Sequence, residues 1–225
     1  EQVRNEVVSF TLSHFKPSAY HEWLQGVLMD WQVPVLTTNF DNCLEQGCKM
    51  YRMKKMTLPN RRFTDYYPWE AYYANHELIY PLGAFGVWHI NGMTRYNRSI
   101  KLSLSDYINQ TARARKFIHS DDKLMDFDNK NKPFWNGINT WLHIFFNTDL
   151  CILGLGLDVN ETFLRWLMIE RERYFRKFPE RRKEGWYLYS REDKMEEGKR
   201  LFLQSTGFNE IKLKSREEVY EGIFQ

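Results

Sequence analysis

The chain has 225 residues and a mass of 27.3 kDa, long enough for one sizeable α/β domain or two small ones. Hydrophobic residues make up 43% of it and aromatic residues 16%, a composition that excludes a disordered or fibrous chain. The 32 basic and 29 acidic residues leave a formal net charge of +3, which neither requires nor excludes a nucleic-acid partner.

Five short apolar or β-branched runs predict strands, and longer segments with helical spacing separate them. The runs cover residues 33–38, 85–90, 150–157, 186–189 and 211–213. Amphipathic helices are predicted over residues 20–31 and 134–146, and capping patterns at Ser103, Ser190 and Ser215 predict further helix starts. Because strands joined by helix-sized connections pair in parallel, we predict an α/β fold, a Rossmann-like, doubly wound, mainly parallel sheet with helices on both faces.

We expect a single domain over residues 1–225 with one irregular excursion. Residues 50–78 are rich in Tyr, Arg, Asn and Pro and have no clean period, so they are expected to lie irregularly beside the site. The three cysteines form no Cys-x-x-Cys pair, so we expect no disulfide framework, no metal and a reducing, cytoplasmic setting. The apolar run 151–157 is far shorter than the roughly 20 residues of a membrane helix, so no membrane partner is expected.

The first predicted strand ends in residues suited to a ligand. In doubly wound sheets the binding crevice lies beyond the carboxyl ends of the strands. Thr37, Thr38, Asn39 and Asp41 offer hydroxyl, amide and carboxylate groups there, at the start of a predicted helix, and such groups can hydrogen-bond a ribose or an amide. The alternative interpretation is that Asn39 or Asp41 only caps that helix.

Two further strands end in polar residues or glycines. The second strand runs into His89, Asn91 and Gly92, and the third into Gly154 and Gly156. Glycine lets a ligand approach the backbone closely, although tight strand-to-helix packing is the commoner meaning of a Gly-x-Gly pair. We expect the three strand ends to converge on one cleft shaped for a dinucleotide.

The order of these strand ends resembles the SIR2-like domain, the sirtuin-related, NAD-consuming domain of bacterial anti-phage defence proteins and some eukaryotic relatives. The resemblance rests on Thr37-Thr38-Asn39-Phe40-Asp41, on the His-containing strand that ends in Gly92, and on Gly154-Leu155-Gly156-Leu157-Asp158. It covers roughly residues 33–167 and implies a Rossmann-type sheet that cleaves the nicotinamide–ribose bond of NAD.

The resemblance also implies roles for individual residues. Asn39 would contact the nicotinamide ribose or orient the attacking water, and Asp41 would hold the nicotinamide side of the pocket. The implied NAD-binding set is Thr37, Thr38, Asn39, Asp41, Gly92, Gly154 and Gly156. True sirtuin deacylases carry a four-cysteine zinc module, which this chain lacks, so protein deacylation is not expected.

The chain departs from the family pattern in three ways, one of which is that Gly156 stands where the sirtuin pattern has a small hydroxyl residue. Asn91 stands where the family has its catalytic His, and an amide cannot act as a general base near neutral pH. His89 is the candidate substitute, but it lies two residues away, roughly 6 to 7 Å along a strand, and a partly buried sheet histidine is the alternative. No Gly-rich phosphate turn precedes Val33, so we expect the first strand and that turn to lie outside this sequence.

These observations predict an NAD hydrolase of the kind used in anti-phage defence, with Asn39, Asn91 and His89 as its candidate catalytic residues. The alternative is a catalytically silent NAD-binding or scaffolding module. Residues 165–183 carry eight basic against three acidic residues, but a solvated charged helix face is the commoner meaning, so nucleic acid is not expected. A homo-oligomer or an attached sensor domain is the expected assembly.

Overall fold

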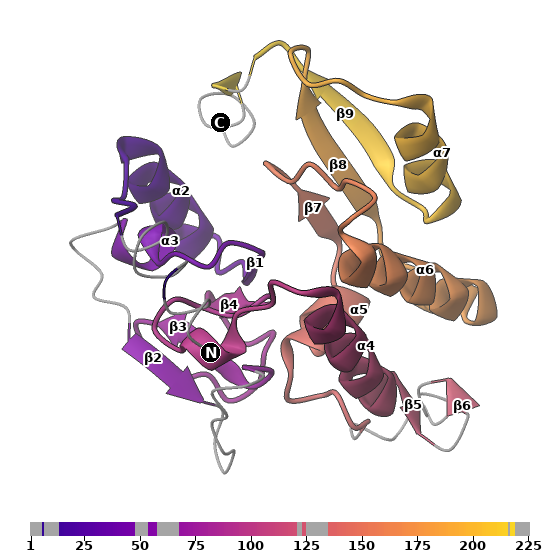
Figure 1. The fold of residues 1–225 in the computed structure, drawn as a ribbon, viewed down its shortest axis with the longest axis horizontal. Helices are drawn as coiled ribbons and strands as arrows, with labels where there is room; N and C mark the ends of the chain where they lie inside the picture. Colours follow the sequence, from indigo (N-terminus) through magenta and orange to yellow (C-terminus); the bar gives the residue numbers. More distant parts are fainter. Residues whose placement is uncertain are drawn as a thin grey trace. The chain divides into compact units, whose positions relative to one another are not determined.

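The chain divides into two compact α/β units, Glu1–Ile144 (unit 1) and Phe145–Gln225 (unit 2). Figure 1 shows the elements of each unit. The computed structural model describes residues 6, 14–47, 54–57, 68–120, 123–124, 135–215 and 217–218. Within these residues, none of the helices is both long enough and apolar enough to cross a membrane.

Unit 1 is built on a four-stranded mixed sheet. Its strand order is β1 (Val35–Thr37), β4 (Val87–His89), β3 (Ala71–Ala74) and β2 (Lys54–Thr57). Strands β1 and β4 are parallel, and the other pairs are antiparallel. The parallel register places Thr37 opposite His89, so β1 and β4 end side by side (Figure 1).

Helices and short elements complete unit 1, and one helix leads into unit 2. They are α2 (Ala19–Asp30), α3 (Cys43–Gln46), η2 (Asn97–Ser99), α4 (Leu104–Ile118), β5 (His119–Ser120), β6 (Lys123–Leu124) and α5 (Trp141–Asn147). The capping box predicted at Ser103 is confirmed, because its Oγ accepts from the Asp106 amide at 3.2 Å and the Asp106 carboxylate accepts from the Ser103 amide at 3.1 Å.

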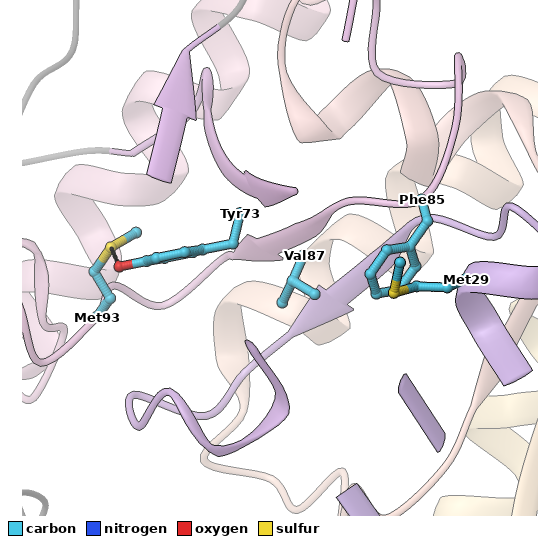
Figure 2. Packing of buried hydrophobic residues seen from close by; sticks show 5 residues of the cluster. All are labelled: Met29, Tyr73, Phe85, Val87 and Met93. Carbon is cyan, nitrogen blue, oxygen red and sulfur yellow. Dashed lines mark hydrogen bonds between the residues drawn. The ribbon is translucent and has the colours of Figure 1, made fainter. Parts of the chain in front are cut away.

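A hydrophobic cluster on one face of this sheet joins α2 to β3 and β4. Its buried members are Met29, Tyr73, Phe85, Val87 and Met93. Figure 2 shows Phe85 packed against Met29, and the Tyr73 hydroxyl directed at the sulfur of Met93, to which it donates at 3.8 Å. Because side chains alternate along a strand, His89 points to the same face as Val87, beside this cluster.

Unit 2 contains a three-stranded, all-parallel sheet. Its order is β7 (Leu150–Ile152), β8 (Gly185–Ser190) and β9 (Asn209–Leu213). Helix α6 (Thr162–Lys177), with the 3₁₀ turn η3 (Pro179–Arg181), connects β7 to β8, and α7 (Glu197–Ser205) connects β8 to β9 (Figure 1). These helix-sized crossovers explain the parallel pairing, since a hairpin turn cannot join parallel strands.

A buried arginine holds the connections of unit 2 together. Arg171 of α6 is 1% exposed, and its guanidinium donates to four backbone carbonyls. Nε contacts Phe145 O at 3.1 Å, and Nη2 contacts Thr148 O, Lys183 O and Glu184 O at 3.0, 3.2 and 3.1 Å. The group therefore ties α6 to the segments that precede β7 and β8.

All five predicted strands are confirmed, but the prediction of a single doubly wound sheet holds only in its coarser form. In the described residues the structure is mixed α/β, and its main strands form two sheets, of which only that of unit 2 is all parallel. The second edge of β4 is taken by antiparallel β3, which comes from the stretch 50–78 that was expected to be irregular. A parallel strand cannot extend the sheet at that edge.

Two predicted helix positions were inaccurate. The helix predicted over residues 134–146 is confined to Trp141–Asn147 among the described residues. The Ser190 pattern does not begin a helix, because the Asp193 carboxylate accepts from the Ser190 amide and hydroxyl at 2.9 and 3.0 Å in a turn, and α7 begins only at Glu197. The same hydrogen bonds serve a turn as well as a helix start.

Candidate functional site

The ends of β1 and β4 come together in unit 1. Beyond the paired residues, the Ile90 amide donates to Thr37 O at 3.0 Å, and the Thr94 amide donates to Phe40 O at 2.8 Å. The segment after β1 therefore lies beside the segment after β4, as expected for the carboxyl ends of neighbouring parallel strands. This edge gathers Thr37–Asp41, His89, Asn91 and Gly92, and we call it the β1/β4 tip.

Asn39 is the exposed residue of the β1/β4 tip, and its backbone is held on both sides. Its amide donates to the hydroxyl oxygen of Thr37 at 3.1 Å, and its carbonyl accepts from Nδ1 of His89 at 2.9 Å. Thr37 and Thr38 are half-buried beside it. A side chain on a fixed backbone that faces solvent is suited to hydrogen-bonding a ligand.

Asp41 has a local structural role. Its Oδ1 accepts from the backbone amide of Cys43 at 3.0 Å, which forms a local turn before α3, whose N-cap is Asn42. Burial, helped by the hydrogen bond that the thiol donates to the Asp41 carboxylate, raises the pKa of Cys43 to about 12. Cys43 is therefore a neutral thiol near pH 7 and not an activated nucleophile.

His89 forms a buried pair with Glu45 of α3. Nε2 of His89 contacts Oε1 of Glu45, and the two side chains are 1% and 3% exposed. The ring of Tyr73 meets the imidazole edge-on at 5.8 Å between centroids. Burial by itself lowers the pKa of His89, but the hydrogen bond and charge of Glu45, helped by the Asn39 carbonyl and the charge of Asp41, raise it above its ordinary value.

These contacts favour the interpretation of His89 as a buried structural histidine. Both ring nitrogens are engaged within unit 1, and a general base needs a free nitrogen within reach of the substrate proton. Glu45 Oε2 is also buried, and it accepts no hydrogen bond from the residues that the structure describes. Removal of His89 would leave a buried carboxylate without its partner.

Asn91 and Gly92 begin the segment that follows β4. Asn91 is 6% exposed, and its carbonyl accepts from the Lys101 amide at 3.1 Å. Gly92 has φ +101°, and a Cβ there would lie 2.2 Å from the carbonyl oxygen of Ser99. Close approach of its own chain therefore requires glycine at this position, whether or not a ligand binds nearby.

Two buried polar residues beside the β1/β4 tip were missed by sequence reasoning. Glu45 follows Asp41 at helical spacing, where a carboxylate normally points to solvent, and nothing local predicts its burial against His89. Gln110 of α4 is 2% exposed and donates to Ile90 O at 2.6 Å. The signal that was available for Gln110 is its position on the apolar stripe of α4 with Ala114 and Ile118, which are also buried.

The third predicted strand end belongs to unit 2. Gly154 has φ +66°, with no atom within 4 Å of the position that a Cβ would occupy. The carbonyl of Gly156 accepts from Nζ of Lys199 at 2.5 Å, and the Leu155 carbonyl accepts from the Tyr187 hydroxyl at 2.6 Å. These two glycines follow β7, which pairs with β8 in the sheet of unit 2, whereas the first two strand ends are neighbours in the sheet of unit 1.

Most of the arginines in the basic segment 165–183 have partners within unit 2. Arg173 pairs with Glu170, Arg176 and Arg182 pair with Glu172, and Arg181 pairs with Glu180. Arg171 is buried on carbonyls, and the guanidinium of Arg165 lies 3.9 Å from the centroid of the Phe202 ring. Each of these arginines therefore has an acidic, carbonyl or aromatic partner within unit 2.

Clusters of three or more His, Cys, Asp or Glu side chains that could hold a metal ion do not occur in the part of the chain that the structure describes. Comparisons of the chain with protein-family models, with curated proteins and with solved structures found no significant match.

Proposed function

We propose that unit 1 binds NAD at the β1/β4 tip. The observation that carries this proposal is the placement of the exposed Asn39, with its backbone held on both sides, at the carboxyl end of a parallel strand pair. Ligands of α/β sheets bind at such ends. The hydroxyls of Thr37 and Thr38 and the amide of Asn39 match a ribose and a carboxamide in hydrogen-bonding capacity.

Binding without rapid hydrolysis is the form of this function that the residues favour. A general base must accept a proton, which the amide of Asn91 cannot do. His89 offers no free nitrogen, since one contacts Glu45 and the other donates to the Asn39 carbonyl. The chain would then act as a nucleotide-sensing or scaffolding module, in a homo-oligomer or beside an attached sensor domain.

Slow NAD hydrolysis is the second candidate, and Asp41 favours it. Cleavage breaks the bond between the ribose C1′ and the nicotinamide nitrogen, and the electron pair leaves with neutral nicotinamide. Water then adds to C1′ and loses its proton to solvent. The developing positive charge on the ribose needs electrostatic stabilisation more than it needs a base, and the half-buried carboxylate of Asp41 at the β1/β4 tip is a suitable group.

Calorimetric titration with NAD tests the proposal. Replacement of Asn39 with Ala should weaken binding by about tenfold or more, which corresponds to loss of about 1.4 kcal/mol of interaction. Asn109→Ala, at an exposed asparagine of α4, is the matched control and should bind as the wild type does. Absence of binding to the wild-type chain, or equal affinity in the two variants, would refute the proposed site.

A chromatographic assay of nicotinamide release distinguishes the NAD-binding module from the slow NAD hydrolase. A binding module releases none, whereas the slow hydrolase releases it at a rate that Asn39→Ala reduces. Asn91→His supplies an imidazole at the position of the missing base and should increase the rate if a base is what limits cleavage. A wild-type rate that Asn91→His leaves unchanged would argue that the limitation lies elsewhere.

A further inference from the structure

The contact between His89 and the carbonyl of Asn39 has a defined direction. A carbonyl oxygen can only accept, so Nδ1 of His89 carries the proton of this 2.9 Å hydrogen bond. The Asn39 amide is already held by Thr37 Oγ1 at 3.1 Å. The backbone of Asn39 is therefore fixed at both of its hydrogen-bonding groups while its side chain stays exposed.

The other nitrogen of the same ring holds the helix that follows. Glu45 lies in α3, six residues after Asn39, and its carboxylate contacts Nε2 of His89. The imidazole thus clamps both ends of the segment 39–45 onto β4. The side chains of His89 and Glu45 are 1% and 3% exposed, so water does not compete for the contact between them.

We propose that the Glu45–His89 pair is a positioning device that holds Asn39 in its ligand-binding orientation. This inference rests on the proposed function, because Asn39 is the residue assigned to the ligand. His89 acts through the Asn39 backbone and touches no ligand itself. Its value for binding is preorganisation: the segment is ordered before the ligand arrives, so binding does not have to pay that cost.

Two substitutions separate the two halves of the clamp. In His89→Asn, the amide nitrogen takes the place of Nδ1, so the variant keeps a donor for Asn39 and loses the contact with Glu45. In His89→Gln, the longer side chain places its amide nitrogen near the position of Nε2, so the variant keeps a donor for Glu45 and loses the contact with Asn39. The variants differ by one methylene and carry the same polar group.

The positioning role predicts opposite orders for stability and affinity. His89→Asn leaves the Glu45 carboxylate buried without its partner, so its Tm should be the lower of the two. His89→Gln leaves the Asn39 carbonyl without its donor, so this variant should bind NAD more weakly, with a Kd about tenfold higher than that of His89→Asn. Val87→Ala, a control in the hydrophobic cluster of the same strand, should lower Tm without weakening the Kd.

The experiment measures Tm, the Kd for NAD by calorimetry, and amide exchange of Thr94 by NMR in the absence of ligand. The Thr94 amide donates to Phe40 O at 2.8 Å, so its exchange reports the order of the neighbouring Asn39 segment. It should exchange faster in His89→Gln than in His89→Asn. If the affinity for NAD fell in the same order as Tm across the three variants, the inference would be overturned. The Glu45–His89 pair would then contribute only to the stability of the core.

Failure of the proposed function has a different signature. If the wild-type chain does not bind NAD, the proposed function is wrong, and the Thr94 exchange alone decides on the clamp. Faster exchange in His89→Gln than in His89→Asn would still support the positioning of Asn39, and equal exchange would overturn it.

Discussion

Each unit buries a basic side chain, and the two are satisfied differently. Arg171 in unit 2 donates to four backbone carbonyls, and burial lowers its pKa to about 10. His89 in unit 1 pairs with one carboxylate and one carbonyl, and that partnership raises its pKa. Arg171 therefore keeps its charge at neutral pH, whereas the charge of His89 depends on pH.

The difference separates a permanent structural group from a conditional one. Arg171 joins the segments that lead into β7 and β8, and nothing within the ordinary pH range removes its charge. The His89 pair lies directly beneath the exposed Asn39, where its state affects the proposed binding residue. Substitutions in the two units should therefore differ in both the size and the pH dependence of their effects.

The largest effect is expected at Arg171. Arg171→Met keeps an apolar stem but removes the buried charged group that donates to four backbone carbonyls, so we expect unit 2 to lose about 3–5 kcal/mol of stability. Denaturant unfolding combined with hydrogen exchange of the β7–β9 amides measures this. Arg200→Met is the control: that side chain is 47% exposed and forms a surface pair with Glu210, so its loss should be much smaller. Comparable losses in both variants would contradict the structural role of Arg171.

The glycines that end β4 and β7 give the second comparison. Gly92→Ala combines a left-handed backbone with a Cβ 2.2 Å from Ser99 O, so we expect a loss of about 2–4 kcal/mol. Gly154→Ala meets no atom within 4 Å, and only its φ of +66° opposes the substitution, at a cost of about 1–2 kcal/mol. Thermal unfolding of the two variants measures the difference. If Gly154→Ala were the more damaging, packing around Gly92 would not be what requires glycine there.

The smallest effect is the pH dependence of the His89 contribution. The pKa of His89 is raised in the folded state. The stabilisation that protonated His89 gives the fold is therefore complete below the ordinary pKa of 6.5, and it is lost as the pH rises through the pKa of the folded state. The difference in stability between the wild type and His89→Asn should therefore shrink as the pH is raised. Urea unfolding of both chains across this range measures it, and contributions from the other histidines cancel. A difference that stays constant with pH would show that His89 does not change its charge there.

Much of the secondary structure could be predicted because its signals are local. The apolar runs around Val35, Val87 and Leu150 are short and end in polar residues or glycine, and each forms a strand where it was expected. The first two strand ends could also be matched, since parallel neighbours end at the same edge. Which strands share a sheet was harder to predict. The second neighbour of β4 is β3 and not a parallel strand, and that choice depends on contacts between residues far apart in the sequence.

By itself, the sequence determined five of the strands and the polar residues that end β1 and β4, because side-chain periodicity and turn chemistry act over a few residues. Only the tertiary structure decided that the strands divide between two units, and that Glu45 lies buried against His89. A carboxylate on a short helix is normally solvated. Its burial depends on which side chain the neighbouring strand presents, and that is settled only when all the elements pack together.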